Sequence, residues 1–335
     1  MSLLYTDVED ELRATVRQVL TDRAPWSAVL KRTESDEPYD TGLWRILSAE
    51  IGVTDLPVPG SEATWREAAV VAEELGRAVA PVPYLGVSMA TAALLAAGEG
   101  PGEQTAVLVA PLSARHTALT FGPGPTVTSV ADALAADVLI VPAADGCYAV
   151  PAADATIEPV LSLDLTRRLA DVTVDVSRGR RLDVDPAVAW ERAWTAGVVL
   201  LASEQLGVAE WCLTTTVEYV KTRYQFGRPV GSFQALKHRL AELWVAVTQA
   251  RAVARYAAGC LADDDPDLAV AASLAQAHCA PVAVKAAEEC VQMHGGIGFT
   301  WEHPAHLYLK RAKSAAIALG TPDWHRARLA ELVDL

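Results

Sequence analysis

Two short segments near the end of the chain combine residue types that suit a nucleotide. The first is RYQFGRPVGSFQ, residues 223–234, which lies between two strongly helical stretches and contains the Gly and Pro residues of a bend. A guanidinium such as that of Arg223 pairs with a pyrophosphate, and an aromatic ring such as that of Phe226 packs against adenine or ribose. The same pattern is also typical of a solvated arginine beside a phenylalanine that closes the end of a helical bundle. The spacing alone leaves both interpretations open.

The second segment is QMHGGIGF, residues 292–299, in which a helix rich in Ala and Val meets a glycine cluster. Glycines remove side chains where a ligand or another backbone approaches, and their N–H groups can donate to a phosphate. Gln292 adds an amide that both donates and accepts hydrogen bonds. The alternative is a helix C-cap followed by a turn, which glycine also favours.

The elements that position these segments follow from the hydrophobic periodicity. The first hundred residues are predicted to be helical. One apolar stripe recurs every three or four positions and consists of Leu3, Leu4, Val8, Leu12, Val16 and Leu20. A second helix is predicted over residues 65–79 and ends before the prolines of residues 80–83, because proline cannot continue the hydrogen-bond ladder. A third helix is predicted over residues 87–97.

From about residue 100 the sequence changes to short β-rich runs separated by Gly, Pro and Asp. The predicted strands are 106–111, 117–121, 138–143 and 170–176. After Asp185 and Pro186, which suit a helix entrance, helices are predicted over 187–222, 234–262, 266–294 and 303–317. We therefore expect an α+β protein that is mainly α. Its predicted parts are an N-terminal helical domain (1–99), a small central β domain (100–182) and a C-terminal four-helix bundle (183–335).

The composition excludes several classes of function. The chain has 28 Lys and Arg residues against 42 Asp and Glu residues, which gives a net charge of −14. Such a chain has no large basic field to attract a phosphodiester backbone, so we expect no nucleic-acid partner. Five cysteines without CxxC spacing argue against a disulfide framework and fit a reducing cytoplasm. The start of the sequence lacks signal-peptide order and no apolar run approaches about 18–20 residues, so we expect a cytoplasmic protein without a membrane span.

The seven histidines do not predict a metal centre. His303 and His306 flank Pro304 and have no third ligand nearby in the sequence, so polar residues at a helix end are the better interpretation. The basic residues Lys310, Arg311 and Lys313 follow this segment. Their pattern fits equally a contact with a CoA phosphate and the neutralisation of helix-terminal carbonyls. No GxSxG elbow signals a serine nucleophile.

Taken together, the order and separation of the two nucleotide-like segments resemble the C-terminal domain of the acyl-CoA dehydrogenase family. There, R-x-x-F-G-x-P…Q and Q-x-x-G-G-x-G-F segments hold the ADP half of FAD. The resemblance covers the chain from about residue 186 onward, and EELGRAVAPVPYLG (73–86) and LDLTRRLADVTV (163–174) also look like family sequence. It implies the acyl-CoA dehydrogenase fold and FAD as cofactor. The FAD contacts that it implies are Arg223, Phe226, Gln292, Gly295 and Gly296, with Gln234 as a further candidate. In that family these contacts reach across a dimer interface to a flavin seated mainly in the neighbouring subunit.

The resemblance fails at the catalytic base. The family removes the α-proton of an acyl-CoA with a glutamate while hydride leaves the β-carbon for the flavin. Most members place this glutamate before the Gly-Thr of an E-G-T motif, where this chain has Leu319. Others place it on the first long C-terminal helix, about 29 residues before the motif phenylalanine, and counting back from Phe226 leads to Gly197. Neither residue accepts a proton. Glu204 lies two helical turns beyond Gly197, about 10 Å along the axis, and is expected to be structural rather than a displaced base.

The predicted β domain also departs from the family pattern. Residues 111–129 contain neither the T-E-P-x-A-G-S-D stretch nor the W-I-T-N-G-like strand that cradles the isoalloxazine ring, and no tryptophan occurs between Trp65 and Trp190. This combination resembles the smaller, base-less subunit of heterotetrameric (α2β2) acyl-CoA dehydrogenases that actinobacteria use on steroid side chains.

That resemblance implies a non-catalytic subunit, which completes the ADP half of the FAD site of a longer catalytic homologue. The complex would α,β-dehydrogenate an acyl-CoA thioester, with a steroid-derived thioester as the candidate substrate, and deliver electrons to an electron-transfer acceptor. Two alternatives stay open. One is a self-sufficient homo-oligomeric enzyme that uses Glu204 as its base, and the other is a flavin-free assembly or regulatory partner.

Overall fold

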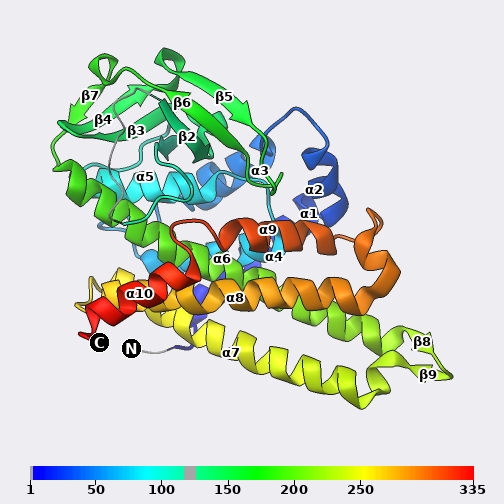
Figure 1. The fold of residues 1–335 in the computed structure, drawn as a ribbon. Coiled ribbons are helices and arrows are strands. Elements are labelled where there is room, and N and C mark those ends of the chain that lie inside the picture. The colour runs from blue at the N-terminus through cyan, green and yellow to red at the C-terminus, as the bar shows by residue number, and fades with distance from the viewer. Residues whose placement is uncertain (1–2, 117–125) are drawn as a thin grey trace.

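The computed structural model describes residues 3–116 and 126–335 of the chain (Figure 1). A β module lies above a helical body, and the helices from the two ends of the sequence lie side by side within that body. The strand predicted at residues 117–121 lies outside the described residues.

The N-terminal helices match the prediction in place but not in every boundary. They are α1 (Asp7–Arg23), α2 (Trp26–Thr33), α3 (Thr41–Arg45), the π-helix η1 (Ile46–Ile51), α4 (Trp65–Ala78) and α5 (Tyr84–Ala96). Helix α5 begins three residues before the predicted start, because Pro83 stands at its N-cap, where the missing N–H costs no helical hydrogen bond. The prediction that the first hundred residues are helical did not resolve α2, α3 or η1 as separate elements.

The prediction of an apolar helical stripe is wrong for its first three residues. Thr6 and Glu9 form a capping box that starts α1 only at residue 7, and Glu9 is buried there in an ion pair with Arg66. The inner side of this first turn is therefore polar. The exposed members of the stripe are Leu3, Leu4 and Val8. Val16 and Leu20 further along the helix are buried, as the periodicity predicts.

The β module contains two small sheets that pack face to face around their own core. The first has the order β1 (Ala106–Leu108), β3 (Val138–Ala143), β4 (Gly146–Pro151) and β7 (Arg180–Leu182). Its β1–β3 pair is parallel, with Ala106 opposite Val138, and its other pairs are antiparallel. The second sheet is antiparallel and has the order β2 (Thr126–Ala131), β6 (Leu169–Thr173) and β5 (Thr156–Val160). The predicted strands at 106–111, 138–143 and 170–176 correspond to β1, β3 and β6.

Three long helices form the C-terminal half: α6 (Pro186–Thr222), α7 (Gln234–Ala262) and α8 (Leu268–His294). A short hairpin of β8 (Tyr224–Gln225) and β9 (Arg228–Pro229), followed by the 3-10 turn η5 (Val230–Ser232), joins α6 to α7. The chain then continues through η6 (Gly295–Phe299), α9 (Ala305–Ala315) and α10 (Pro322–Leu332). The long helices agree with the predicted ranges, whereas α10 has no counterpart in the prediction.

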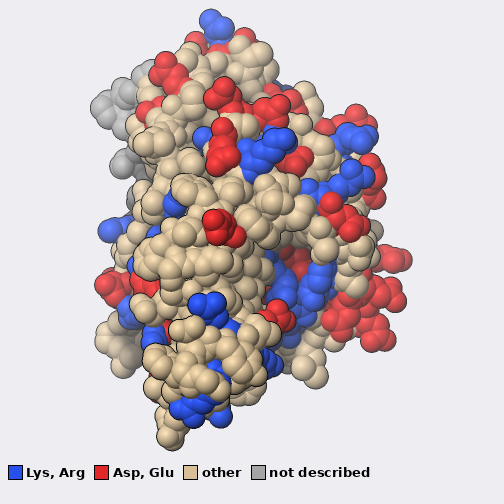
Figure 2. All heavy atoms as spheres, turned by 90° about the vertical axis from the view of Figure 1, so that its right-hand side faces the viewer, with Lys and Arg blue, Asp and Glu red and all other residues tan. Residues whose placement is uncertain are grey.

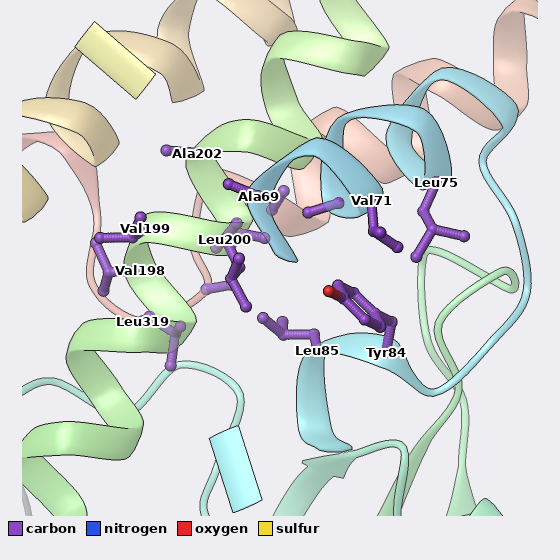
Figure 3. Packing of buried hydrophobic residues seen from close by; sticks show 14 of the residues in the cluster. Ala69, Val71, Leu75, Tyr84, Leu85, Val198, Val199, Leu200, Ala202 and Leu319 are labelled. Atoms are coloured by element: carbon purple, nitrogen blue, oxygen red, sulfur yellow. The ribbon is translucent and has the colours of Figure 1, made fainter. Parts of the chain in front are cut away.

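One hydrophobic core unites the N-terminal and C-terminal helices. Helices α4 and α6 cross with their backbones in contact, and each contributes a glycine at the crossing. A Cβ atom at Gly76 would lie 2.0 Å from the carbonyl oxygen of Glu204, and one at Gly207 would lie 1.9 Å from that of Glu73. Figure 3 shows the apolar side chains of α4, α5 and α6 meeting around this seam. Because no larger residue fits at the crossing, the two glycines fix how closely the helices approach.

Two helices are long and apolar enough to cross a membrane by length and composition. In α6, 94% of the most apolar window is buried inside the protein, and in the α8–η6 segment 56% is buried. The apolar character of α6 therefore comes from its position at the centre of the core.

Candidate functional site

A groove at the hairpin end of the helical bundle brings the two nucleotide-like segments together. Its volume is about 330 Å³, and its lining includes Arg223, Gln292, Gly295 and Gly296. Arg223 comes from the C-terminal end of α6, and the other three come from the C-terminal end of α8 and the start of η6. The sequence-predicted contacts that are far apart in the chain thus share one surface.

Arg223 stands where α6 turns into the hairpin. Its carbonyl oxygen accepts the N–H of Val230 at 2.8 Å, which fixes the backbone at the bend. Within the described residues no carboxylate lies within ion-pair distance of its guanidinium, and the side chain is exposed. A cation that is held at a groove without an internal partner is available to an anionic ligand.

Phe226 lies at the tip of the hairpin and not in the wall of the groove. It is 89% exposed, and both it and Gly227 have positive φ angles, 55° and 74°, as a two-residue hairpin turn requires. Its ring meets the ring of Phe233 edge-on at a centroid distance of 6.1 Å, and Arg228 covers Phe233 at 3.9 Å. The interpretation that Phe226 closes the end of the bundle is therefore wrong, since the ring projects into solvent.

The structure explains the two neighbouring glycines differently. The backbone conformation requires glycine at residue 295, whereas no contact among the described residues requires it at residue 296. Gly295 has φ 61° and ψ −136°, a region that only glycine adopts readily. Gly296 has no positive φ, and a Cβ atom added there would meet open space. By contrast, a Cβ at Gly298 would lie 2.5 Å from the carbonyl of Val291, so packing accounts for that glycine. Gly296 leaves the backbone bare on the groove side, which is where a phosphate or a neighbouring chain would approach.

The two predicted glutamines differ in position. Gln292 is exposed and lines the groove at the last turn of α8. Gln234 is the first residue of α7, lies outside the groove lining, and has its amide nitrogen 3.4 Å from Nε2 of His238. The structure therefore groups Gln292, but not Gln234, with Arg223.

The groove also contains residues that the sequence did not single out. Tyr219 lies one helical turn before Arg223, stacks on His294 at 4.3 Å, and donates its hydroxyl to the carbonyl of His294 at 3.4 Å. This contact holds the residue directly before Gly295. Arg239 reaches the same groove from α7. The one available sequence signal for Tyr219 was its spacing of four residues from Arg223.

Charge at this end of the molecule contrasts with the acidic chain as a whole. Figure 2 looks along the bundle from the hairpin side, and the charged side chains on the lowest part of that face are mainly Lys and Arg. Acidic side chains gather toward the right-hand edge of the same view. An anionic ligand would therefore meet a locally favourable field at the groove despite the net charge of −14.

The two positions at which the family places its base meet in an apolar, filled region. A Cβ atom at Gly197 would lie 2.9 Å from Cδ1 of Leu319 and 2.9 Å from Sδ of Met89. Leu319 is 1% exposed and its N–H donates to the carbonyl of Leu112 at 2.8 Å. In Figure 3 its side chain belongs to the same apolar cluster as those of α6. Neither position offers a group that accepts a proton, and there is no room for one without repacking.

Aromatic rings fill the space beside Leu319. Trp194 stacks with His325 at 5.6 Å, and Trp324 meets both rings edge-on at 5.7 and 4.9 Å. Trp194 Nε1 donates to the carbonyl of Ala114 in the β module at 3.2 Å, and His325 Nε2 donates to the carbonyl of Leu319 at 3.0 Å. Burial lowers the pKa of His325 to about 4, so the ring is neutral at pH 7. This cluster seals the junction of the β module with α6 and α10.

Glu204 is the centre of a buried ion network. Arg167 of the β module donates to its Oε2 at 2.5 Å, and Arg311 of α9 donates to Oε1 at 2.9 Å and to Oε2 at 3.1 Å. Arg311 also donates to Asp164 and to Thr166, both at 3.1 Å. Burial raises the pKa of Glu204, but the two guanidiniums outweigh it and the pKa is lowered overall. A carboxylate whose two oxygens both accept hydrogen bonds from guanidiniums is a poor proton acceptor. This arrangement fits the structural role expected for Glu204.

The basic residues after the glycine cluster do not form a joint patch. Arg311 is buried in the Glu204 network, Lys313 pairs with Glu288 at 2.6 Å, and Lys310 lies 4.9 Å above the ring of Trp301. Burial in the Glu204 network excludes Arg311 from a CoA phosphate contact, whereas such a contact of Lys310 or Lys313 stays a prediction.

The two histidines that flank Pro304 pack against other rings. His303 lies 4.1 Å from the ring of His294, and His306 lies 4.4 Å from that of Trp301. Across residues 3–116 and 126–335, no group of three or more His, Cys, Asp or Glu side chains is arranged to hold a metal ion. The five cysteines are buried and unbridged.

Comparison with known proteins identifies the family. The model of the acyl-CoA dehydrogenase C-terminal domain matches residues 189–333, and that of the N-terminal domain matches residues 6–113. Acyl-CoA dehydrogenase IpdE2 of Mycobacterium tuberculosis is 41% identical over 316 residues, which cover 93% of this chain and 92% of that protein. The chain belongs to the acyl-CoA dehydrogenase family. IpdE2 of Mycolicibacterium smegmatis is also similar, with 38% identity over 95% of this chain and 96% of that protein.

Solved acyl-CoA dehydrogenases share the fold over the whole chain. The ChsE4–ChsE5 complex from Mycobacterium tuberculosis superposes with a TM-score of 0.85 at 24% identity and covers 100% of this chain and 99% of that one. A variant of the Tcur3481–Tcur3483 steroid ACAD superposes with a TM-score of 0.83 at 26% identity and covers 98% of each chain. Acyl-CoA dehydrogenase family members bind FAD and act as oxidoreductases on acyl-CoA. The mainly helical fold with a small β module is therefore confirmed as that of the family.

Proposed function

We propose that this chain is the non-catalytic subunit of a heteromeric FAD-dependent acyl-CoA dehydrogenase. It pairs with a longer, catalytically complete homologue and completes the ADP half of that partner's FAD site. The complex converts an acyl-CoA thioester with a bulky, steroid-derived acyl group to its α,β-unsaturated form. Electrons then pass to an electron-transfer acceptor.

One contrast within the chain carries this proposal. The groove retains Arg223, which pairs with no carboxylate among the described residues, together with an exposed Gln292 and the bare backbone of Gly296. All three suit a dinucleotide. The positions of the base hold Gly197 and Leu319, and apolar side chains fill the space between them. The chain thus keeps the contacts that serve a neighbour and lacks the proton acceptor that it would need for itself.

The roles of the chain's own residues follow from their geometry. Bound FAD supplies the acceptor for the hydride that leaves the acyl β-carbon. Arg223 binds the pyrophosphate as a charge-assisted donor, and Gly295 and Gly296 present backbone N–H groups beside it. Phe226 at the hairpin tip offers an exposed ring for the adenine or ribose. Tyr219 orients the glycine pair through the carbonyl of His294.

The related proteins give independent support. Both solved complexes are named for two different chains, and one of them is described as a steroid ACAD. A heteromer with a steroid-derived substrate is therefore the arrangement that this chain's retained and missing groups fit best.

Co-expression with the full-length homologue tests the proposal. We expect the pair to purify as an α2β2 complex with a flavin spectrum and dehydrogenase activity, and this chain alone to bind no stoichiometric FAD. In the complex, Arg223→Ala should release FAD. Arg192→Ala is the matched control, because Arg192 is also an exposed arginine at the surface of α6 but pairs with Asp264 away from the groove. Stoichiometric flavin and activity in the isolated chain would refute the proposal.

A further inference from the structure

A second guanidinium lines the groove from a third helix. Arg239 of α7 lines the same groove as Arg223 of α6, and Gln292 of α8 and Gly296 of η6 belong to the same lining. The sequence gives no sign of this, because Arg239 belongs to neither motif and its exposed position on a helix is typical of a solvated arginine. Only the packing of α7 against the ends of α6 and α8 places it at the groove.

Arg239 is held by a single contact that leaves donors free. Its Nη2 lies 2.5 Å from Oε2 of Glu289, which is 15% exposed at the side chain. This ion pair uses one of the five N–H donors of the guanidinium. Glu289 therefore anchors the side chain, while the other N–H groups of Arg239 remain able to donate to a ligand.

The helix ends around the groove favour a second cation there. Helices α6 and α8 both end there, and each C-terminus carries roughly half a negative charge. Helix α7 begins there and contributes roughly half a positive charge. Glu289 adds a further negative charge beside Arg239. The positive charge of Arg239 therefore offsets these negative charges and adds to that of Arg223 in attracting a pyrophosphate.

We infer that Arg239 is a second pyrophosphate-binding residue of the ADP half-site and that Glu289 positions it. This inference rests on the proposed function, since the pyrophosphate is that of the partner's FAD. Arg223 and Arg239 approach the ligand from different helices, so together they hold it across the groove. An ADP moiety gains from both guanidiniums, whereas adenosine, which has no phosphate, gains from neither.

The test uses the complex with the full-length homologue after its FAD has been removed. FAD is titrated back in the presence of ADP or adenosine as competitors. We expect Arg239→Gln to weaken FAD and ADP about 10- to 100-fold and to leave the inhibition constant of adenosine unchanged. Arg239→Lys should restore part of the loss, because it restores the charge. Arg192→Gln, which removes an arginine from an exposed ion pair elsewhere on α6, should change none of these constants.

The outcomes separate the two proposals. If Arg223→Ala weakens FAD and Arg239→Gln does not, the inference about Arg239 is overturned and the proposed function stands. Equal weakening of ADP and adenosine by Arg239→Gln also overturns it, because that pattern indicates a distorted groove. If neither substitution affects FAD, or if the wild-type pair binds no FAD, the proposed function fails and the inference fails with it.

Discussion

Replacing Glu204 with glutamine should destabilise the protein, not disarm a catalytic base. The substitution keeps the size of the side chain and removes its charge. Among the described residues, Arg311 would keep one carboxylate within ion-pair distance, Asp164, and Arg167 would keep none. Removal of one partner from a buried ion pair typically costs about 3–5 kcal/mol. That is a large part of the roughly 5–15 kcal/mol that stabilise a typical domain.

Urea-induced unfolding, followed by far-UV circular dichroism, measures this cost. We expect the midpoint for Glu204→Gln to fall sharply at an unchanged slope. Glu191→Gln is the matched control on the same helix, because Glu191 is 64% exposed at the side chain and lies 3.8 Å from His116. Its effect should stay within about 0.5 kcal/mol. An unchanged midpoint for Glu204→Gln, together with lost turnover at full flavin content, would refute the structural assignment and restore Glu204 as a base.

Three further predictions concern the core and the groove. Gly207→Ala should destabilise the protein by about 1–3 kcal/mol or more, because its Cβ would lie 1.9 Å from a carbonyl of α4; the midpoint of urea unfolding measures this. Gly296→Ala should leave that midpoint unchanged, since its Cβ meets open space, but should weaken FAD binding in the complex, which fluorescence titration would show. The free energy of unfolding should fall as the pH drops from about 6.5 to about 4, because burial lowers the pKa of His325 to about 4 and the unfolded chain takes up its proton first. At about 1.4 kcal/mol per unit, His325 contributes up to about 3 kcal/mol to this loss, and His325→Gln should flatten the measured pH profile; an unchanged profile would contradict the assignment.

The long helices were predictable because residues next to their ends in the sequence determine where they start. Asp185 caps α6 and Pro186 occupies its first turn, so the start of the helix needed no tertiary information. Two of the missed strands, β5 and β7, lack such signals. Strand β5 contains Pro159, and β7 is three residues long with two arginines. These strands exist because they pair with neighbours far away in the sequence, which periodicity does not show.

The candidate site was predictable where residue type alone carries the chemistry. Arg223, Gln292 and Gly296 were found from their motifs, and the structure places them in one groove. The contact of Gly197 with Leu319 was beyond sequence reasoning, because it depends on how the end of α9 folds back against α6. The sequence left two interpretations of Phe226 open, a nucleotide contact and closure of the bundle end. Only the exposure of its ring in the structure excludes the second.

The crossing of α4 and α6 has a consequence for biosynthesis. Gly76 leaves the ribosome more than a hundred residues before Gly207, the other glycine of this crossing. At about 5–20 residues per second, the apolar face of α4 is synthesised on the order of ten seconds before α6, the helix that packs on it. The β module has its own core and can close as soon as residues 106–182 have emerged. Nascent chains should therefore engage chaperones through their first helices, and release should coincide with translation of α6.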